Sequence, residues 1–251
     1  MRRKFIRCNF MKDSVAGVAR VQPTTPALAD GSAPVFHKND VILFQGDSIT
    51  DGGRERTGND QNHGFGQGYA YIIAAQISAR FPDRNFRFIN RGISANKVTD
   101  LAVRWQNDTL DLKPNFLSIL VGINDNFKNE GDNFENTYDK LLSDTLAALP
   151  GVKIVLGEPF MLPAGVIKDG YGEWASYDDH MADVKKLQEA VSRLAEKYHL
   201  PFIHYQKAFD DACLLAPVDY WCWDGIHPTY SGHGLMVREW LRVVNESWPN
   251  G

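Results

Sequence analysis

The chain has 251 residues, of which 43% are hydrophobic and 23% charged, and its formal net charge is −4. This length fits one α/β domain whose core needs no disulfide or metal to hold it together. The slightly acidic balance argues against a nucleic-acid partner, and no apolar run approaches the ~20 residues that span a bilayer.

The amino-terminal 35 residues differ in character from the rest of the chain. The basic run at 2–7 contains a twin arginine and resembles the core of a twin-arginine export signal, and residues 27–29 read Ala-Leu-Ala, an A-x-A cleavage pattern. Charged residues interrupt the apolar stretch between them, as in a disordered basic tail. We therefore expect residues 1–35 to be a tail or export signal and residues 36–251 the folded domain. Cleavage of a signal would place the protein in the periplasm or outside the cell, and the alternative is the cytoplasm.

The three cysteines offer little chemistry. Cys8, Cys213 and Cys222 form no Cys-x-x-Cys pair, so the sequence does not favour a zinc site. Cys213 and Cys222 are close enough along the chain to be bridged in an exported protein, or they are two small buried residues. Their spacing leaves both alternatives open.

From about residue 38 the pattern alternates between strand and helix. The expected strands are residues 41–45, 85–90, 115–121, 152–156 and 202–205. The expected helices are residues 69–81, 96–112, 136–149, 179–199 and a carboxyl-terminal helix around 237–244. A long loop at 51–67 separates the first strand from the first helix. This alternation predicts an α/β fold in three layers, an α/β/α sandwich with a central, mostly parallel five-stranded sheet.

The first strand leads directly into the most suggestive residues of the chain. Four apolar residues, 41–44, are typical of a strand buried on both faces, and Gly46-Asp47-Ser48 follow at its carboxyl end. Open α/β sheets place their active sites at that edge. We therefore expect Ser48 to be a nucleophile, which needs a base, an orienting acid and donors for an oxyanion.

Other strands also end in polar clusters, which a parallel sheet would bring to the same edge. They are Asn90-Arg91-Gly92-Ile93-Ser94, Gly122-Ile123-Asn124-Asp125 and Gly157-Glu158-Pro159. Near the carboxyl terminus, Asp224 and His227 stand three apart on a loop rich in Gly and Pro. An imidazole that takes a proton from serine needs an acceptor for its other ring nitrogen, and Asp224 can supply it.

These blocks carry a family resemblance. Gly46-Asp47-Ser48-Ile49-Thr50, Gly92, Gly122-Ile123-Asn124-Asp125 and Asp224-Gly225-Ile226-His227-Pro228 resemble the four blocks of the GDSL, or SGNH, hydrolases. They occur in the family's order and cover about residues 41–233. The alternative serine elbow, Gly-x-Ser-x-Gly, is absent because Thr50 occupies the place of the second glycine.

The resemblance implies a flavodoxin-like fold and a serine esterase. Ser48 would attack an ester carbonyl, His227 would move its proton and Asp224 would orient His227. The N–H groups of Ser48 and Gly92 and the side-chain amide of Asn124 would form the oxyanion hole. It implies no metal and no cofactor.

Candidate substrate contacts are less well determined. They are Asp47, His63, Trp221 and Trp223. Asp47 is also interpreted as an anchor of its loop, and Trp221 and Trp223 as either a wall that stacks on a sugar or a packing element of the carboxyl-terminal helix. Asp125 is expected to be a structural hydrogen-bonding group.

The remaining histidines have simpler interpretations. We expect His63, His180 and His233 to be surface or satisfied histidines rather than substrate contacts, and His204 to be packed inside the fifth strand.

The function expected from these residues is hydrolysis of short-chain, chiefly acetyl, esters on a small molecule or polysaccharide. The alternatives are a lysophospholipase- or thioesterase-like acylhydrolase and a non-catalytic carbohydrate-binding protein. Natural substrate, acyl length and oligomeric state stay open.

Overall fold

The computed structural model describes residues 35–57, 60–125, 131–170, 172 and 176–249. Residues 1–34 of the expected export segment therefore lie outside the described residues, and its last residue, Val35, is buried in the core. In the described part, no helix is both long and apolar enough to cross a membrane.

The centre of the fold is a five-stranded sheet in which every neighbouring pair is parallel. Its strands are β1 Val41–Gly46, β2 Arg87–Asn90, β3 Phe116–Leu120, β4 Lys153–Gly157 and β5 Phe202–Ile203. Their spatial order is β2-β1-β3-β4-β5. This is the doubly wound, flavodoxin-like order: successive strands are added on one side of β1 and then, from β3 onward, on the other side. The sequence-based fold class is confirmed.

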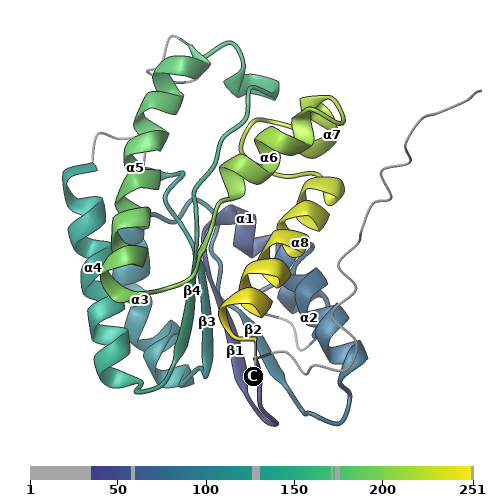
Figure 1. The fold of residues 1–251 in the computed structure, drawn as a ribbon, viewed down its shortest axis with the longest axis vertical. Coiled ribbons are helices and arrows are strands. Elements are labelled where there is room, and N and C mark those ends of the chain that lie inside the picture. The colour runs from purple at the N-terminus through teal and green to yellow at the C-terminus, as the bar shows by residue number, and fades with distance from the viewer. Residues whose placement is uncertain (1–34, 58–59, 126–130, 171, 173–175, 250–251) are drawn as a thin grey trace, which may run out of the picture.

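Helices cover both faces of the sheet (Figure 1). They are α1 Ser48–Asp51, α2 Tyr69–Arg80, α3 Val98–Asp108, α4 Gly131–Ala148, α5 Tyr177–Tyr198, α6 Tyr205–Cys213, α7 Val218–Trp221 and α8 Tyr230–Ser247. Short 3-10 turns lie at η1 His63–Phe65, η2 Leu110–Leu112 and η4 Gly165–Ile167.

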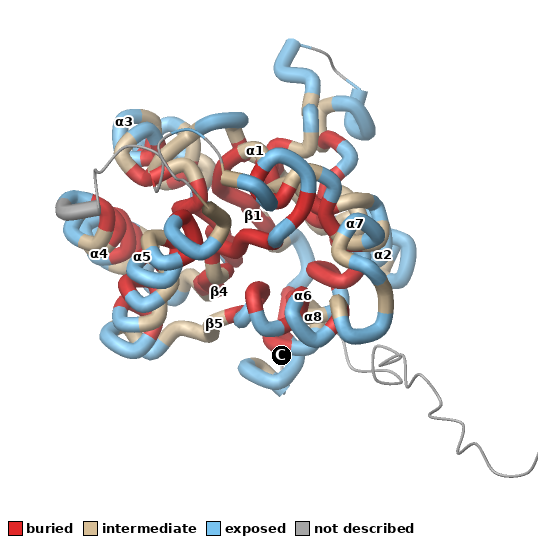
Figure 2. Tube along the Cα trace, turned by 90° about the horizontal axis from the view of Figure 1, so that it is seen from above, coloured by how far each residue is buried: buried red, intermediate tan, exposed pale blue. Residues whose placement is uncertain are grey.

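The core consists of two apolar clusters, one on each face of the sheet. On one face, Ile42 and Phe44 of β1 pack with residues of α2, α6 and α8, among them Trp240. On the other, Leu43 packs with residues of α3, α4 and α5, among them Trp105. Successive residues of a strand point to opposite faces, so the apolar run of β1 serves both clusters. Figure 2 shows the buried trace concentrated in β1 and β4 between these layers.

Most expected elements are found within a few residues of their predicted bounds, with informative exceptions. The expected helix 96–112 is α3 followed by the separate turn η2. The segment 51–67, expected as an unstructured loop, contains η1 and begins at the end of the four-residue helix α1.

The interpretation of His204 as packed inside a strand is wrong. β5 ends at Ile203, and His204 is the exposed N-cap of α6, a helix that the sequence reading did not include. Tyr205, Ala208, Phe209 and Ala212 of α6 are buried, at the spacing of one helix face. The helical spacing of these apolar residues explains why the chain forms α6 from Tyr205 onward and does not continue the strand β5.

Cys213 and Cys222 are both free thiols. Cys222 is buried, and its Sγ donates to the carbonyl oxygen of His227 at 3.2 Å.

Candidate active site

Ser48 is placed by a sharp transition from strand to helix. β1 ends at Gly46, where a side chain would put its Cβ 2.2 Å from the carbonyl oxygen of Leu120, so only glycine fits. Asp47 caps α1 by accepting the N–H of Ile49 at 3.0 Å. Ser48 is thus the first residue of α1, where an N–H has no acceptor within the helix.

His227 and Asp224 come from a loop that is closed at its base. Cys222 and Pro228 form an antiparallel bridge, and the N–H of Trp223 donates to the carbonyl of His227 at 3.2 Å. Asp224 Oδ1 accepts the main-chain N–H of Ile226 at 2.9 Å and that of His227 at 2.7 Å. The carboxylate therefore fixes the backbone that carries the imidazole.

The three side chains form a series of hydrogen bonds. Ser48 Oγ lies 2.8 Å from Nε2 of His227, and Nδ1 of His227 lies 2.6 Å from Oδ2 of Asp224. The carboxylate selects the imidazole tautomer with a proton on Nδ1, which leaves Nε2 free to accept the Ser48 hydroxyl proton. Residues that are 179 apart in sequence are therefore in contact.

The charges of the pair support this arrangement. The hydrogen bond that His227 Nδ1 donates to Asp224 raises the pKa of His227 above its usual value, against the opposing effect of burial. Burial raises the pKa of Asp224, but the hydrogen bonds from the His227 side chain and from the His227 and Ile226 N–H groups outweigh it. The pKa of Asp224 is therefore lowered.

The expected oxyanion donors differ in whether they already donate a hydrogen bond within the protein. The amide of Asn124 donates to the carbonyl of Asn96 at 3.0 Å, which orients it, and no acceptor among the described residues takes its second N–H. The N–H of Gly92 already donates to Oδ1 of Asn90 at 2.8 Å. Sequence reasoning missed this bond, although an Asn two residues before a Gly is a common turn-forming signal.

Asn90 is a buried residue that ties the Gly92 turn to the segment around Ser48. Its Nδ2 donates to the carbonyls of Thr50 and Phe65, at 2.7 and 2.8 Å. A Cβ on Gly92 would lie 2.3 Å from the N of Asp51, so the two segments touch along their backbones.

Two acidic residues near the site are buried and structural. Asp47 exposes 1% of its surface, and desolvation raises its pKa to about 7 despite the Ile49 hydrogen bond. Its hydrogen bond to the N–H of Ile49 anchors the turn from β1 into α1. Asp125 accepts the N–H of Val98 at the start of α3, and burial raises its pKa to about 7 also.

The two candidate tryptophans have different surroundings. Trp221 is half-buried and packs against the core cluster that includes α8. Trp223 is 63% exposed. Its ring stacks on His227, with 5.8 Å between the ring centroids and 21° between the ring planes. Trp223 is thus beside the candidate base, and Trp221 is a packing element.

Two other histidines hydrogen-bond to groups outside the Ser48–His227–Asp224 series. His63 is exposed and pairs with Asp60. His233 is half-buried and accepts the N–H of Tyr69 at 3.2 Å through Nδ1, and His180 is buried on α5.

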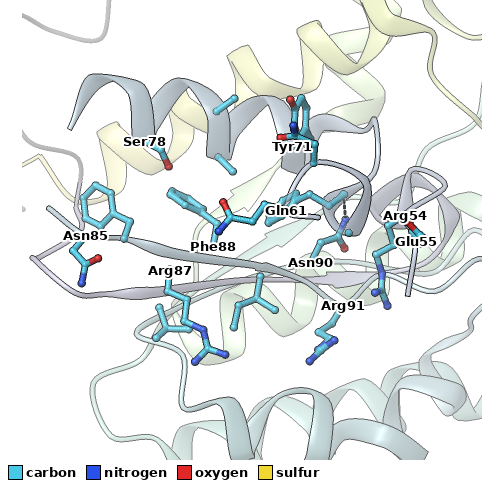
Figure 3. Close-up of a pocket in the computed structure, with 18 of the residues that line it drawn as sticks. Arg54, Glu55, Gln61, Tyr71, Ser78, Asn85, Arg87, Phe88, Asn90 and Arg91 are labelled. Carbon is cyan, nitrogen blue, oxygen red and sulfur yellow. Dashed lines mark hydrogen bonds between the residues drawn. The ribbon is translucent and has the colours of Figure 1, made fainter. Parts of the chain in front are cut away.

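A groove of about 890 Å³ runs along the edge strand β2, between α2 and residues 54–56 and 61–64 (Figure 3). Phe88 and Gln61 lie on the α2 side of the strand, and Arg87 and Arg91 point to the opposite side. Arg54, at one end, donates from Nε to the carbonyl of Gly92 at 2.8 Å. The groove is therefore joined to the Gly92 turn.

An all-parallel sheet with Ser, His and Asp hydrogen-bonded in series at the carboxyl ends of its strands is an arrangement typical of hydrolases with a serine nucleophile. Comparison with known proteins agrees. Residues 44–235 match the GDSL-like lipase/acylhydrolase family. The chain belongs to this family, and it is a carboxylic ester hydrolase.

Individual relatives are similar to the chain over most of its length. An acetylxylan esterase from Geobacillus stearothermophilus is 31% identical over 219 residues, which are 82% of this chain and 94% of that protein. A crystal structure of an acetylxylan esterase from the same organism superposes with a TM-score of 0.70 at 30% identity, covering 83% of this chain and 95% of that chain. A GDSL-like lipase from Parabacteroides merdae superposes with a TM-score of 0.76 at 36% identity, covering 84% and 99%.

Proposed function

We propose that this protein is a serine esterase that removes short acyl groups, chiefly acetyl, from a carbohydrate through an acyl-Ser48 intermediate. The observation that carries the proposal is the series of hydrogen bonds from Ser48 through His227 to Asp224. A hydroxyl that donates to an imidazole held by a carboxylate is the geometry of an activated nucleophile.

The reaction proceeds in two displacements. The Ser48 oxygen adds to the ester carbonyl carbon as the hydroxyl proton passes to Nε2 of His227. The tetrahedral intermediate then collapses, the bond to the alcohol oxygen breaks, and His227 returns the proton to the departing alcohol. Water, deprotonated by the same imidazole, attacks the acyl-Ser48 ester and releases the carboxylic acid and the free serine.

The negative oxygen of each tetrahedral intermediate needs donors. Within the part of the chain that the structure describes, the N–H of Ser48, at the first position of α1, and the second N–H of Asn124 have no competing acceptor. The N–H of Gly92 contributes as a shared donor, because Asn90 already accepts from it. The proposal therefore assigns the larger contribution to Ser48 and Asn124.

The carbohydrate part of the proposal rests on two supports. A relative of 31% identity is an acetylxylan esterase. The exposed face of Trp223 lies beside His227, where an apolar ring can stack on a sugar whose ester is being cleaved.

A chain-length series tests acyl and substrate class together. p-Nitrophenyl esters from acetate to decanoate are compared with acetylated xylooligosaccharides, and released acid is measured. We expect activity to fall steeply beyond short acyl groups and acetate to be released from the oligosaccharide. Activity that rises with acyl length, with no acetate released from sugar, would favour the lysophospholipase- or thioesterase-like alternative.

We also propose that residues 1–35 are an export segment ahead of a single hydrolase domain, residues 36–251. The support is the twin arginine at the amino terminus and the Ala-Leu-Ala at 27–29. Amino-terminal sequencing of the protein recovered from the periplasm or medium should begin at about Asp30. An intact Met1 terminus in the cytoplasm alone would contradict it.

A further inference from the structure

Arg104 lies on α3, next to the loop that carries Gly92, and makes more hydrogen bonds than an arginine on the surface usually does. Only 14% of its side chain is exposed. It forms an ion pair with Asp108, one turn along the same helix, at 3.1 Å. That pair would be enough to satisfy an arginine on a helix surface, yet the guanidinium also donates to four acceptors that lie outside α3.

The first of these acceptors controls the Gly92 donor. Arg104 NH1 donates to the carbonyl oxygen of Arg91 at 2.9 Å. That carbonyl belongs to the same peptide unit as the N–H of Gly92. Because the peptide is planar, holding the carbonyl fixes the direction of the N–H on the other side of the bond. A hydrogen bond to the carbonyl also polarises the amide and strengthens its N–H as a donor.

The second acceptor controls the Asn124 donor. Arg104 Nε donates to Oδ1 of Asn96 at 2.9 Å. The main-chain carbonyl of Asn96 in turn accepts from the amide of Asn124 at 3.0 Å. One residue therefore links the guanidinium to the carboxamide, and a displaced Asn96 would allow that carboxamide to rotate.

The remaining acceptors belong to the end of β1, next to Ser48. Arg104 NH1 lies 3.0 Å from Oε1 of Gln45, and NH2 lies 3.4 Å from the carbonyl oxygen of Gly46. The contact with Gly46 is long, so it contributes little to holding Arg104 in place. Gln45 is itself fully buried and donates to the carbonyl of Asp108 and the hydroxyl of Thr109 at the end of α3.

We propose that Arg104 is a positioning residue that holds the Gly92 and Asn124 donors in register with Ser48. The inference rests on the proposed function, because it matters only if those donors bind an oxyanion. A planar guanidinium with five N–H groups can reach three separate segments at once, whereas a lysine ammonium has a single nitrogen. The donors come from loops that follow different strands. Arg104 contacts the loop of Gly92 directly and reaches Asn124 through Asn96.

The test compares Arg104→Met, which keeps the apolar stem and removes the donors, with wild type on p-nitrophenyl acetate. We expect kcat to fall about 10- to 100-fold with KM changed less than about threefold, because part of the contribution of each oxyanion donor is lost. Arg104→Lys should show the same split, since it keeps the charge without the planar fork. If Arg104→Met does not fold, the lysine variant alone carries the test.

Arg193→Met is the matched control. Arg193 donates from two nitrogens to Glu135 across the exposed faces of α5 and α4, so the substitution removes an arginine–carboxylate pair away from the site. Its kcat should equal that of wild type. A kcat within about twofold of wild type for both Arg104 variants would overturn the inference.

A double-mutant cycle separates positioning from general destabilisation. Because Arg104 is inferred to hold Asn124 as well as Gly92, adding Arg104→Met to Asn124→Ala should lower kcat less than it does in wild type, with only the Gly92 share remaining. Multiplicative losses in the double variant would overturn the link from Arg104 through Asn96 to Asn124. The proposed function fails differently: Ser48→Ala would then keep wild-type turnover, whatever the Arg104 variants do.

Discussion

His227 contacts both oxygens of Asp224: its Nδ1 lies 2.6 Å from Oδ2, and its main-chain N–H donates to Oδ1 at 2.7 Å. The carboxylate thereby sets the position, the tautomer and the charge preference of the imidazole. Its hydrogen bond is the largest cause of the raised pKa of His227. The behaviour of the enzyme with pH should follow from this one contact.

We expect kcat/KM for p-nitrophenyl acetate to rise with pH through the pKa of His227 in the free enzyme, because only the neutral imidazole accepts the Ser48 proton. The midpoint should lie above 6.5, the usual value, since the pKa of His227 is raised. A pH–rate profile measures it. A midpoint below the usual histidine value would contradict the assignment of His227 as base.

Asp224→Asn should lower kcat by about 10⁴-fold, because an amide no longer selects the productive tautomer. It should also move the acidic limb of the profile to lower pH, since the largest cause of the raised His227 pKa is removed. Asp211→Asn is the control, as Asp211 pairs with Lys207 on an exposed face of α6. Unchanged turnover in Asp224→Asn would contradict the role of the carboxylate.

Asn124→Ala should reduce kcat by about 10²- to 10³-fold and leave KM nearly unchanged, because the lost N–H binds the oxyanion and not the ground-state ester. Steady-state kinetics on p-nitrophenyl acetate measure the split. The fold should persist, since among the described residues the side chain bonds to the carbonyl of Asn96 alone. A defect confined to KM would count against the oxyanion role.

Asp47→Asn should change how stability depends on pH. The pKa of Asp47 is raised to about 7 in the folded protein, chiefly by burial, against 3.8 ordinarily. Between these values the native state keeps a proton that the unfolded chain has released, so this group makes stability fall as pH rises from about 4 to about 7. Asparagine keeps the cap on α1 without a titratable charge.

The measurement for Asp47→Asn is the Tm at pH 4.5 and at pH 8. The gain of the variant over wild type should be larger at pH 8, where the buried carboxylate of wild type is ionised. Asp144→Asn, on an exposed face of α4, serves as the control and should show no such difference. An equal gain at both pH values for Asp47→Asn would mean that the buried carboxylate does not titrate in this range.

Trp223→Leu should impair acetylated xylooligosaccharides more than p-nitrophenyl acetate, because the sugar would lose its stacking surface while the stack on His227 affects both substrates. The ratio of the two kcat/KM values measures the loss that is specific to the sugar, because an effect on His227 lowers both values equally. Tyr230→Leu removes another exposed aromatic, on α8, and should leave that ratio unchanged. Equal losses on both substrates would mean that Trp223 acts only through its stack on His227 and does not bind the sugar.

The sequence predicts most of the frame of this site, for identifiable reasons. The apolar run of β1, the polar residues after it, and the Asp224–His227 spacing are local patterns, and a parallel sheet brings strand ends together. Their meeting at 2.8 and 2.6 Å could not be read from spacing alone, since it depends on the loop closed by the Cys222–Pro228 bridge.

What the sequence did not reveal are side chains whose roles depend on distant backbone. Arg104 reads as a charge on an amphipathic helix, and only the fold brings it to the carbonyl of Arg91 and the side chain of Asn96. Asn90 likewise reads as the end of a strand, while its bond to the N–H of Gly92 changes how free that donor is. α6 was missed although its apolar spacing is regular, because the short strand before it resembled a longer one.

The central claim is that Ser48 carries the acyl group. It is tested most directly by rapid quenching of the enzyme with p-nitrophenyl acetate, followed by peptide mass spectrometry, with Ser48→Ala treated in parallel. We expect wild type to gain the mass of one acetyl group on the peptide that contains Ser48, and Ser48→Ala to show neither adduct nor turnover. Acetylation at another residue as the turnover intermediate, or wild-type turnover by Ser48→Ala, would contradict the account.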